Sequence, residues 1–131
     1  MPETFVGMML RNFLFIGAGG ALGSMARYGV SQLMSKFVEL PNIFISTFTI
    51  NVLGSFIIGL IFGLVNRHQI SELNWLVLAT GFCGGFTTFS TFALENINLM
   101  NRGQSLLAFF YTGFSIVVGL LLCRVGIWLA G

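Results

Sequence analysis

The stretch GGFTTFSTF, residues 84–92, combines two adjacent glycines, four hydroxyl side chains and three phenylalanines. It begins at the middle of Leu73–Leu94, a window that contains no Asp, Glu, Lys or Arg. Glycine and β-branched threonine both have low helix propensity. The stretch therefore predicts that a long apolar helix is interrupted near its midpoint.

The rest of the chain has the composition of a membrane protein. Of its 131 residues 56% are hydrophobic and only 8% charged, and the mean hydropathy is +0.93; soluble domains carry about 25% charged residues. A spanning helix needs about 20 mostly apolar residues. Three further segments meet that need: Leu40–Asn66, Gly103–Cys123 and Asn12–Ser35, the last with Arg27 inside it.

These segments predict an all-α integral membrane protein made of one domain with four transmembrane helices. The spans are expected at about 12–35, 43–65, 74–99 and 103–124, with the third helix broken. The connections are too short for a soluble domain, and no metal-ligand cluster, nucleophile with a base or phosphate-binding loop is present in the sequence. We expect a multi-pass protein of the cell (inner or plasma) membrane, surrounded by lipid, with no enzymatic activity and no nucleic-acid partner.

A broken helix at mid-membrane leaves backbone groups that no water satisfies. Their partner is expected to be protein, a water-filled cavity or an ion, and inward-facing carbonyl oxygens suit a hard cation such as Na⁺. The alternative is an unbroken helix whose glycines only allow close packing. The pairs Gly19/Gly23 and Gly59/Gly63 have the spacing of tight membrane helix contacts.

Polar side chains form two stripes on otherwise apolar helices. Thr47, Asn51 and Ser55 recur every four residues, and so do Tyr111 and Ser115. Hydroxyl and amide groups donate hydrogen bonds to anions, and phenylalanine rings present a positive edge. The alternatives are that the hydroxyls bond their own helix and that the phenylalanines are packed in the core.

Charged residues give two further indications. Arg27 and Glu95 lie inside spans or at their boundary, which makes them functional candidates by default; for Arg27 a structural or electrostatic role is favoured over ion binding.

With four spans, three basic residues (Arg11, Arg67, Arg124) lie on one side and two (Lys36, Arg102) on the other. Because a clear excess normally sets orientation, this near tie predicts either insertion in both orientations or one weakly set orientation. A chain that inserts both ways can pair with its own inverted copy.

The sequence resembles the Fluc/CrcB family of microbial fluoride channels over about residues 12–119. The resemblance is carried by GFCGGFTTFSTFALE, by GGALGSMARY in the first span, by TINVLGSFIIG in the second and by NRG before the fourth. It implies a dual-topology antiparallel homodimer with two parallel fluoride pores and a Na⁺ ion at the centre of the dimer interface.

The resemblance also implies site residues. Backbone carbonyls of Gly84 and Thr87 from each subunit are expected to hold Na⁺. The pore is expected to be lined by Asn51, Phe89, Phe92, Ser90, Thr91, Thr47, Tyr111 and Ser115. Glu95 and Arg27 match the family pattern, and the resemblance assigns them no particular step in conduction. Where some relatives have another serine, this chain has Gly119, which puts the outer end of the hydroxyl row in question.

The expected function is passive, selective export of F⁻ that lowers cytoplasmic fluoride. A small dual-topology multidrug or cation exporter also fits the size and the charge tie, but it needs a carboxylate in its substrate chamber, for which Glu95 is the only candidate. A non-transporting assembly subunit is the third class. It has little use for polar stripes beside a mid-membrane break.

Overall fold

The computed structural model describes residues 1–39, 42 and 44–131, and the described part contains only helices and their connections. Four helical stretches are long and apolar enough to span a membrane, which confirms the prediction of four transmembrane helices. They are α1 (Phe5–Met34), α2 (Phe44–Asn66), the third helix (Glu72–Asn101) and α6 (Ser105–Ala130).

The ends of these helices differ from the expected bounds. Helix α1 begins at Phe5 instead of residue 12, because Thr4 caps it by accepting a hydrogen bond from the Gly7 N–H at 3.1 Å. Helix α6 runs past residue 124 to Ala130. The expected start of the second span, residue 43, lies outside the described residues.

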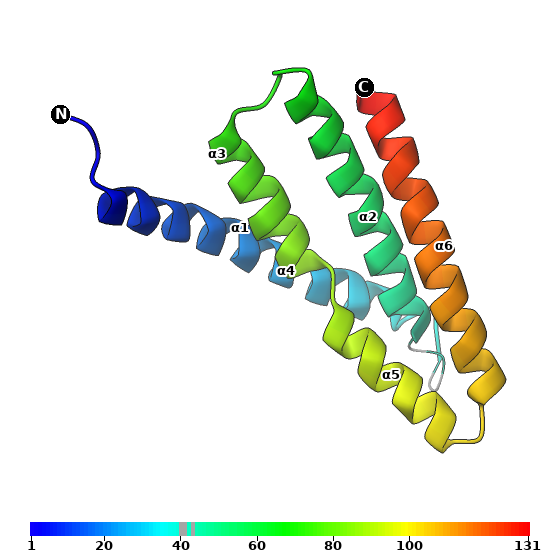
Figure 1. Ribbon diagram of the computed structural model, residues 1–131. Coiled ribbons are helices and arrows are strands. Elements are labelled where there is room, and N and C mark those ends of the chain that lie inside the picture. The colour runs from blue at the N-terminus through cyan, green and yellow to red at the C-terminus, as the bar shows by residue number, and fades with distance from the viewer. Residues whose placement is uncertain (40–41, 43) are drawn as a thin grey trace.

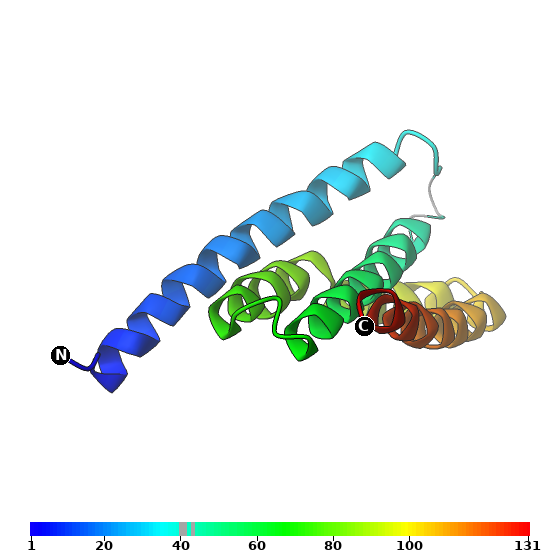
Figure 2. The ribbon, with the colours of Figure 1, turned by 90° about the horizontal axis from the view of Figure 1, so that it is seen from above.

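The helices form two layers (Figures 1 and 2). Helix α2, the third helix and α6 lie side by side, and α1 crosses one face of them, with its N-terminal end projecting beyond the others. Both chain termini and the α2–α3 loop lie at one end of the molecule, and the α5–α6 turn lies at the other. The count of three basic residues on one side of the membrane against two on the other assumes this arrangement of termini and connections.

The third helix consists of four pieces. They are α3 (Glu72–Trp75), the π-helix η1 (Leu76–Cys83), α4 (Gly84–Phe86) and α5 (Phe89–Asn101). Between α4 and α5, Thr87 and Thr88 have extended backbone, with φ/ψ of −81°/157° and −147°/119°. The predicted interruption is therefore confirmed, but it lies at the two threonines, hereafter the break, and the glycine pair before them stays helical.

Glycines bring α1 into direct contact with the third helix. A Cβ atom on Gly19 would overlap the Val77 carbonyl oxygen, and one on Gly23 would overlap that of Phe82. Gly59 meets the Cys123 carbonyl of α6 in the same way. The tight helix contacts that the spacing of Gly19/Gly23 and Gly59/Gly63 predicts are therefore confirmed, while the break itself lies at the threonines.

A tight turn places α6 beside α5. Gly103 has φ +75°, a left-handed conformation that favours glycine, and the Gln104 N–H donates to the Leu99 carbonyl at 2.9 Å. The chain therefore reverses within a few residues, and α6 packs against α5.

We expect Gly23→Ala to destabilise the fold by about 1–3 kcal/mol, because the new methyl group enters the carbonyl of Phe82. Gly17→Ala on the same helix is the matched control, since a Cβ there meets nothing within 4 Å. Thermal unfolding in detergent, followed by circular dichroism, compares the two. Equal melting temperatures for both variants would contradict the packing described here.

Candidate functional site

One side chain holds the break in place. Asn51 Nδ2 donates to the Thr88 carbonyl at 3.0 Å, and the Thr88 N–H donates to Asn51 Oδ1 at 2.8 Å. Both backbone groups of Thr88 are therefore satisfied by one amide from α2. In a continuous α-helix the Thr88 N–H would bond to the carbonyl of Gly84; here that carbonyl is released from its helical partner.

The carbonyls at the end of α4 have further partners. The Cys83 carbonyl accepts from the Thr87 N–H at 3.0 Å and from Thr87 Oγ1 at 2.8 Å. Arg27 Nε on α1 donates to the Gly85 carbonyl at 3.1 Å. A cation at the C-terminal end of a helix is favourable for the helix dipole. The structure therefore places the Arg27 charge at the backbone that leads into the break.

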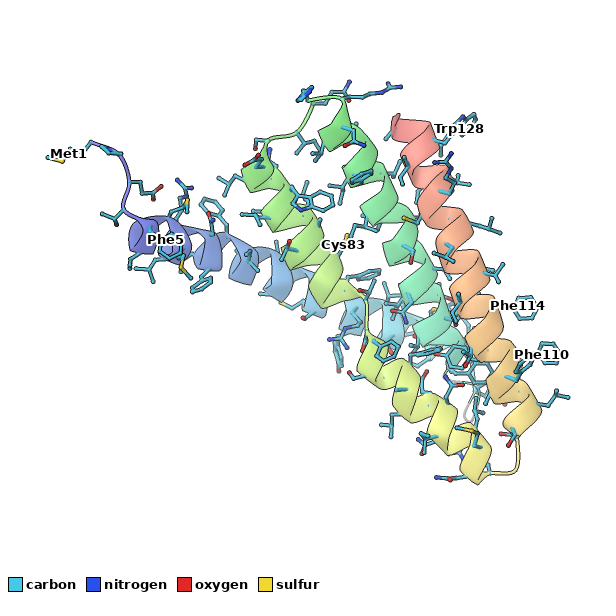
Figure 3. The ribbon with its side chains drawn as sticks, viewed as in Figure 1. Met1, Phe5, Cys83, Phe110, Phe114 and Trp128 are labelled. Atoms are coloured by element: carbon cyan, nitrogen blue, oxygen red, sulfur yellow. The ribbon has the colours of Figure 1, made fainter. Side chains whose placement is uncertain are left out.

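A hollow of about 430 Å³ lies beside the break, between α2, the third helix and α6. Cys83, one of the residues that line it, is labelled in Figure 3, where it lies on the third helix facing α2. Six residues of the expected site meet at this hollow: Asn51, Gly84, Thr87, Phe89, Phe92 and Ser115.

The hollow contains hydrogen-bond donors that are not fully used. Ser115 Oγ is buried and makes no hydrogen bond within the described residues. The Asn51 amide carries two N–H hydrogens, and its bond to Thr88 uses one of them. Ser55, a lining residue that the expected site did not include, donates to the Asn51 carbonyl at 2.8 Å.

The two phenylalanines of the site have different surroundings. The Phe92 ring packs edge-to-face with Tyr111, with ring centroids 5.1 Å apart and an interplanar angle of 74°. Phe89 lies 5.8 Å from Phe92 between ring centroids and is 79% exposed. Phe92 is therefore held within the chain, whereas Phe89 points out of it.

The remaining hydroxyls of the stripes lie at Glu95. Thr47 Oγ1 donates to Glu95 Oε1 at 2.6 Å, and Tyr111 OH donates to Glu95 Oε2 at 2.7 Å. Thr47 and Tyr111 are buried. The expected hydroxyl row is thus divided: Ser115 lines the hollow, while Thr47 and Tyr111 surround the carboxylate.

Ser90 and Thr91 belong to the first turn of α5. The Thr91 N–H donates to Thr88 Oγ1 at 3.3 Å, and Thr88 Oγ1 donates to Thr91 Oγ1 at 3.1 Å. Ser90 is exposed. Thr88, which caps α5 and binds Asn51, was missed by the sequence reasoning; a threonine directly before the first apolar residue of a helical pattern, here Phe89, is the N-cap signal that indicates it.

Fold and site together define a small membrane protein with four spanning helices, a break in the third and, beside that break, a mostly apolar hollow whose lining includes a few polar side chains. The sequence profile of the family described as "CrcB-like protein, Camphor Resistance (CrcB)" matches residues 14–127. The chain belongs to this family.

Curated relatives extend over nearly the whole chain. The fluoride-specific ion channel FluC of Gloeothece citriformis is 48% identical over 117 residues, which cover 88% of this chain and 94% of the relative. The protein of the same name from Chlorobium phaeobacteroides is 42% identical over 120 residues (90% and 91%). The one from a Hydrogenobaculum species is 42% identical over 121 residues (92% and 98%).

Proposed function

We propose that this chain forms a passive channel specific for fluoride. The observation that carries the proposal is the hollow at the break. There a buried hydroxyl and an amide hydrogen that have no hydrogen-bond partner among the described residues meet two phenyl rings. The names of its relatives, fluoride-specific ion channels, support the same function.

The chemistry of the lining suits a small, strongly hydrated anion. Fluoride that enters the membrane gives up water, and hydroxyl and amide donors from Ser115 and Asn51 replace part of that shell. The ring edges of Phe89 and Phe92 carry a positive partial charge and add to it. The two rings therefore favour an anion in the hollow.

A passive pathway is sufficient for export. HF is neutral and crosses the bilayer, then dissociates near neutral pH and leaves F⁻ inside. An inside-negative potential drives the anion outward by about 2.3 kcal/mol per charge per 100 mV. Fluoride export therefore needs neither ATP nor a proton relay.

The working unit of this proposal is an antiparallel homodimer in the lipid bilayer. Phe89 and Gly84 belong to the hollow yet are exposed on the single chain. A second copy in the opposite orientation covers them, and the near tie of basic residues permits that orientation. Phe89 of one copy then completes a pore together with the other copy.

The proposal includes Na⁺ at the dimer centre, held by the carbonyls of Gly84 and Thr87 from both copies. The Gly84 carbonyl suits this role because its helical partner, the Thr88 N–H, is bonded to Asn51. Gly84 and Thr87 would supply the oxygens that hold the ion, and the ion would add a positive charge near the pores. Diffraction density on the two-fold axis tests this, and an empty axis in a dimer prepared in sodium would contradict it.

The alternative function, a proton-coupled exporter of organic cations, has less support. Such an exporter needs a carboxylate in its chamber, and within the part of the chain that the structure describes the hollow is lined by none. Glu95 accepts hydrogen bonds from Thr47 and Tyr111 outside that lining.

Liposomes that contain only this protein separate the two functions. With internal potassium fluoride, valinomycin and no pH gradient, we expect a fluoride electrode to record rapid efflux, and liposomes loaded with chloride to release none. Uptake of an organic cation driven by a pH gradient, without fluoride efflux, would instead favour the exporter.

Dual topology predicts a labelling pattern. In a background without Cys83 and Cys123, single cysteines at Gln69 in the α2–α3 loop and at Gln104 in the α5–α6 turn are each expected to react with an impermeant maleimide from both sides of the membrane. Both sites are exposed, so access is not limiting. Labelling of each site from one side only would exclude an antiparallel dimer.

A further inference from the structure

Two neighbouring residues of α5 bond two neighbouring residues of α6. Tyr111 OH donates to Glu95 Oε2 at 2.7 Å, and Thr112 Oγ1 donates to Asn96 Oδ1 at 2.9 Å. Asn96 is buried, with 9% of its surface exposed. A buried amide is costly unless it is hydrogen-bonded. Neither Asn96 nor Thr112 lines the hollow, so the proposed pore gives them no role.

The pair of bonds fixes how α5 is rotated. Consecutive residues of an α-helix project about 100° apart, so the two bonds reach α6 in different directions. Together they set the rotation of α5 about its own axis as well as its distance from α6. Helix α5 needs such a constraint, because the extended backbone at Thr87 and Thr88 separates it from α4.

The Asn96 bond leads directly to the site. Asn96 Nδ2 donates to the Phe92 carbonyl at 3.0 Å, one turn earlier on α5. The Phe92 ring in turn lies edge-to-face on Tyr111, the residue beside Thr112. A chain of hydrogen bonds therefore runs from Thr112 through Asn96 to the backbone of Phe92, whose ring lines the hollow.

We propose that Asn96 and Thr112 are positioning residues that orient the Phe92 ring and thereby set the anion selectivity of the pathway. The transport part of this inference rests on the proposed fluoride channel; the orientation of the ring does not. Thr112→Val removes the hydroxyl and keeps the side-chain shape, whereas Thr112→Ser keeps the hydroxyl. Thr49→Val is the matched control, because among the described residues the Thr49 hydroxyl bonds only the Ile45 carbonyl of its own helix.

Fluorine NMR of the full-length protein with 4-fluorophenylalanine at position 92 reads the ring directly. We expect one narrow signal in the parent protein, in Thr112→Ser and in Thr49→Val, and a shifted or broadened signal in Thr112→Val. If Thr112→Val does not fold, Thr112→Ala carries the same test. An unchanged signal in the variant without the hydroxyl, or an equal change in Thr112→Ser, would overturn the inference.

Transport gives the second readout. Because a buried acceptor loses its donor, we expect fluoride efflux per folded protein to fall about tenfold in Thr112→Val and chloride efflux, absent from the parent, to become measurable. Thr112→Ser retains the donor, so its fluoride efflux should stay within about twofold of the parent and it should release no chloride. A parent protein that releases no fluoride refutes the proposed channel, while the NMR signal still decides whether Asn96 and Thr112 orient the ring. A channel that is active but has unchanged selectivity in Thr112→Val refutes the role in selectivity.

Discussion

Fluoride efflux through the Asn51→Asp variant is expected to fall at least about a hundredfold, the equivalent of roughly 2.7 kcal/mol. The parent side chain both donates to the Thr88 carbonyl and accepts from the Thr88 N–H. An ionised carboxylate only accepts, so the Thr88 carbonyl loses its donor and faces a negatively charged oxygen instead. The same charge repels an anion in the hollow. Efflux from liposomes at equal protein content measures the loss.

Asn66→Asp is the matched control for this variant. It makes the same chemical change at the exposed end of α2, away from the break, and is expected to leave efflux unchanged. Gel filtration verifies that both variants keep the assembly of the parent. If a folded Asn51→Asp protein conducts like Asn66→Asp, Asn51 belongs neither to the pore nor to the support of the break.

Phe92→Leu and Phe89→Leu are each expected to lower fluoride efflux about tenfold or more, since an aliphatic side chain lacks the positive ring edge. The fold should survive, because apolar swaps of similar volume usually cost less than about 1.5 kcal/mol. A larger stability loss is expected for Phe92→Leu than for Phe89→Leu. Phe92 packs on Tyr111, whereas Phe89 is exposed on the single chain.

Phe5→Leu controls for the general effect of removing a ring. Phe5 lies at the projecting N-terminal end of α1 (Figure 3), so its loss should change neither efflux nor stability. Efflux at the parent rate through folded Phe89→Leu and Phe92→Leu proteins would assign both rings to ordinary packing and move the pore to another face.

The sequence was sufficient to predict the four membrane helices and the broken third helix, because both follow from local composition. Charge-free windows of spanning length define the helices, and glycines with threonines in such a window weaken the helix. The position of the break was not predictable in this way. Gly84 stays helical while Thr88 is extended. Thr88 can leave the helix because the Asn51 amide, on another helix, bonds both its N–H and its carbonyl.

The site shows the same division between local and long-range information. A four-residue spacing placed Asn51 and Ser115 on inward-facing stripes, and both line the hollow. The spacing alone does not reveal that Thr47 and Tyr111 donate to Glu95, since these contacts join residues 48 and 16 positions apart. The bond between Asn96 and Thr112 was missed for the same reason.

A bi-ionic current measurement tests the central claim most directly, that the hollow at the break belongs to a pathway that conducts fluoride and excludes chloride. The purified parent protein is placed in a planar bilayer with sodium fluoride on one side and sodium chloride on the other. The account predicts a current carried by fluoride alone. The reversal potential should lie near the limit for a membrane that only fluoride crosses, and no current should flow when both sides contain chloride and no fluoride. Equal conduction of the two anions, or the absence of fluoride current from a correctly folded protein, would contradict it.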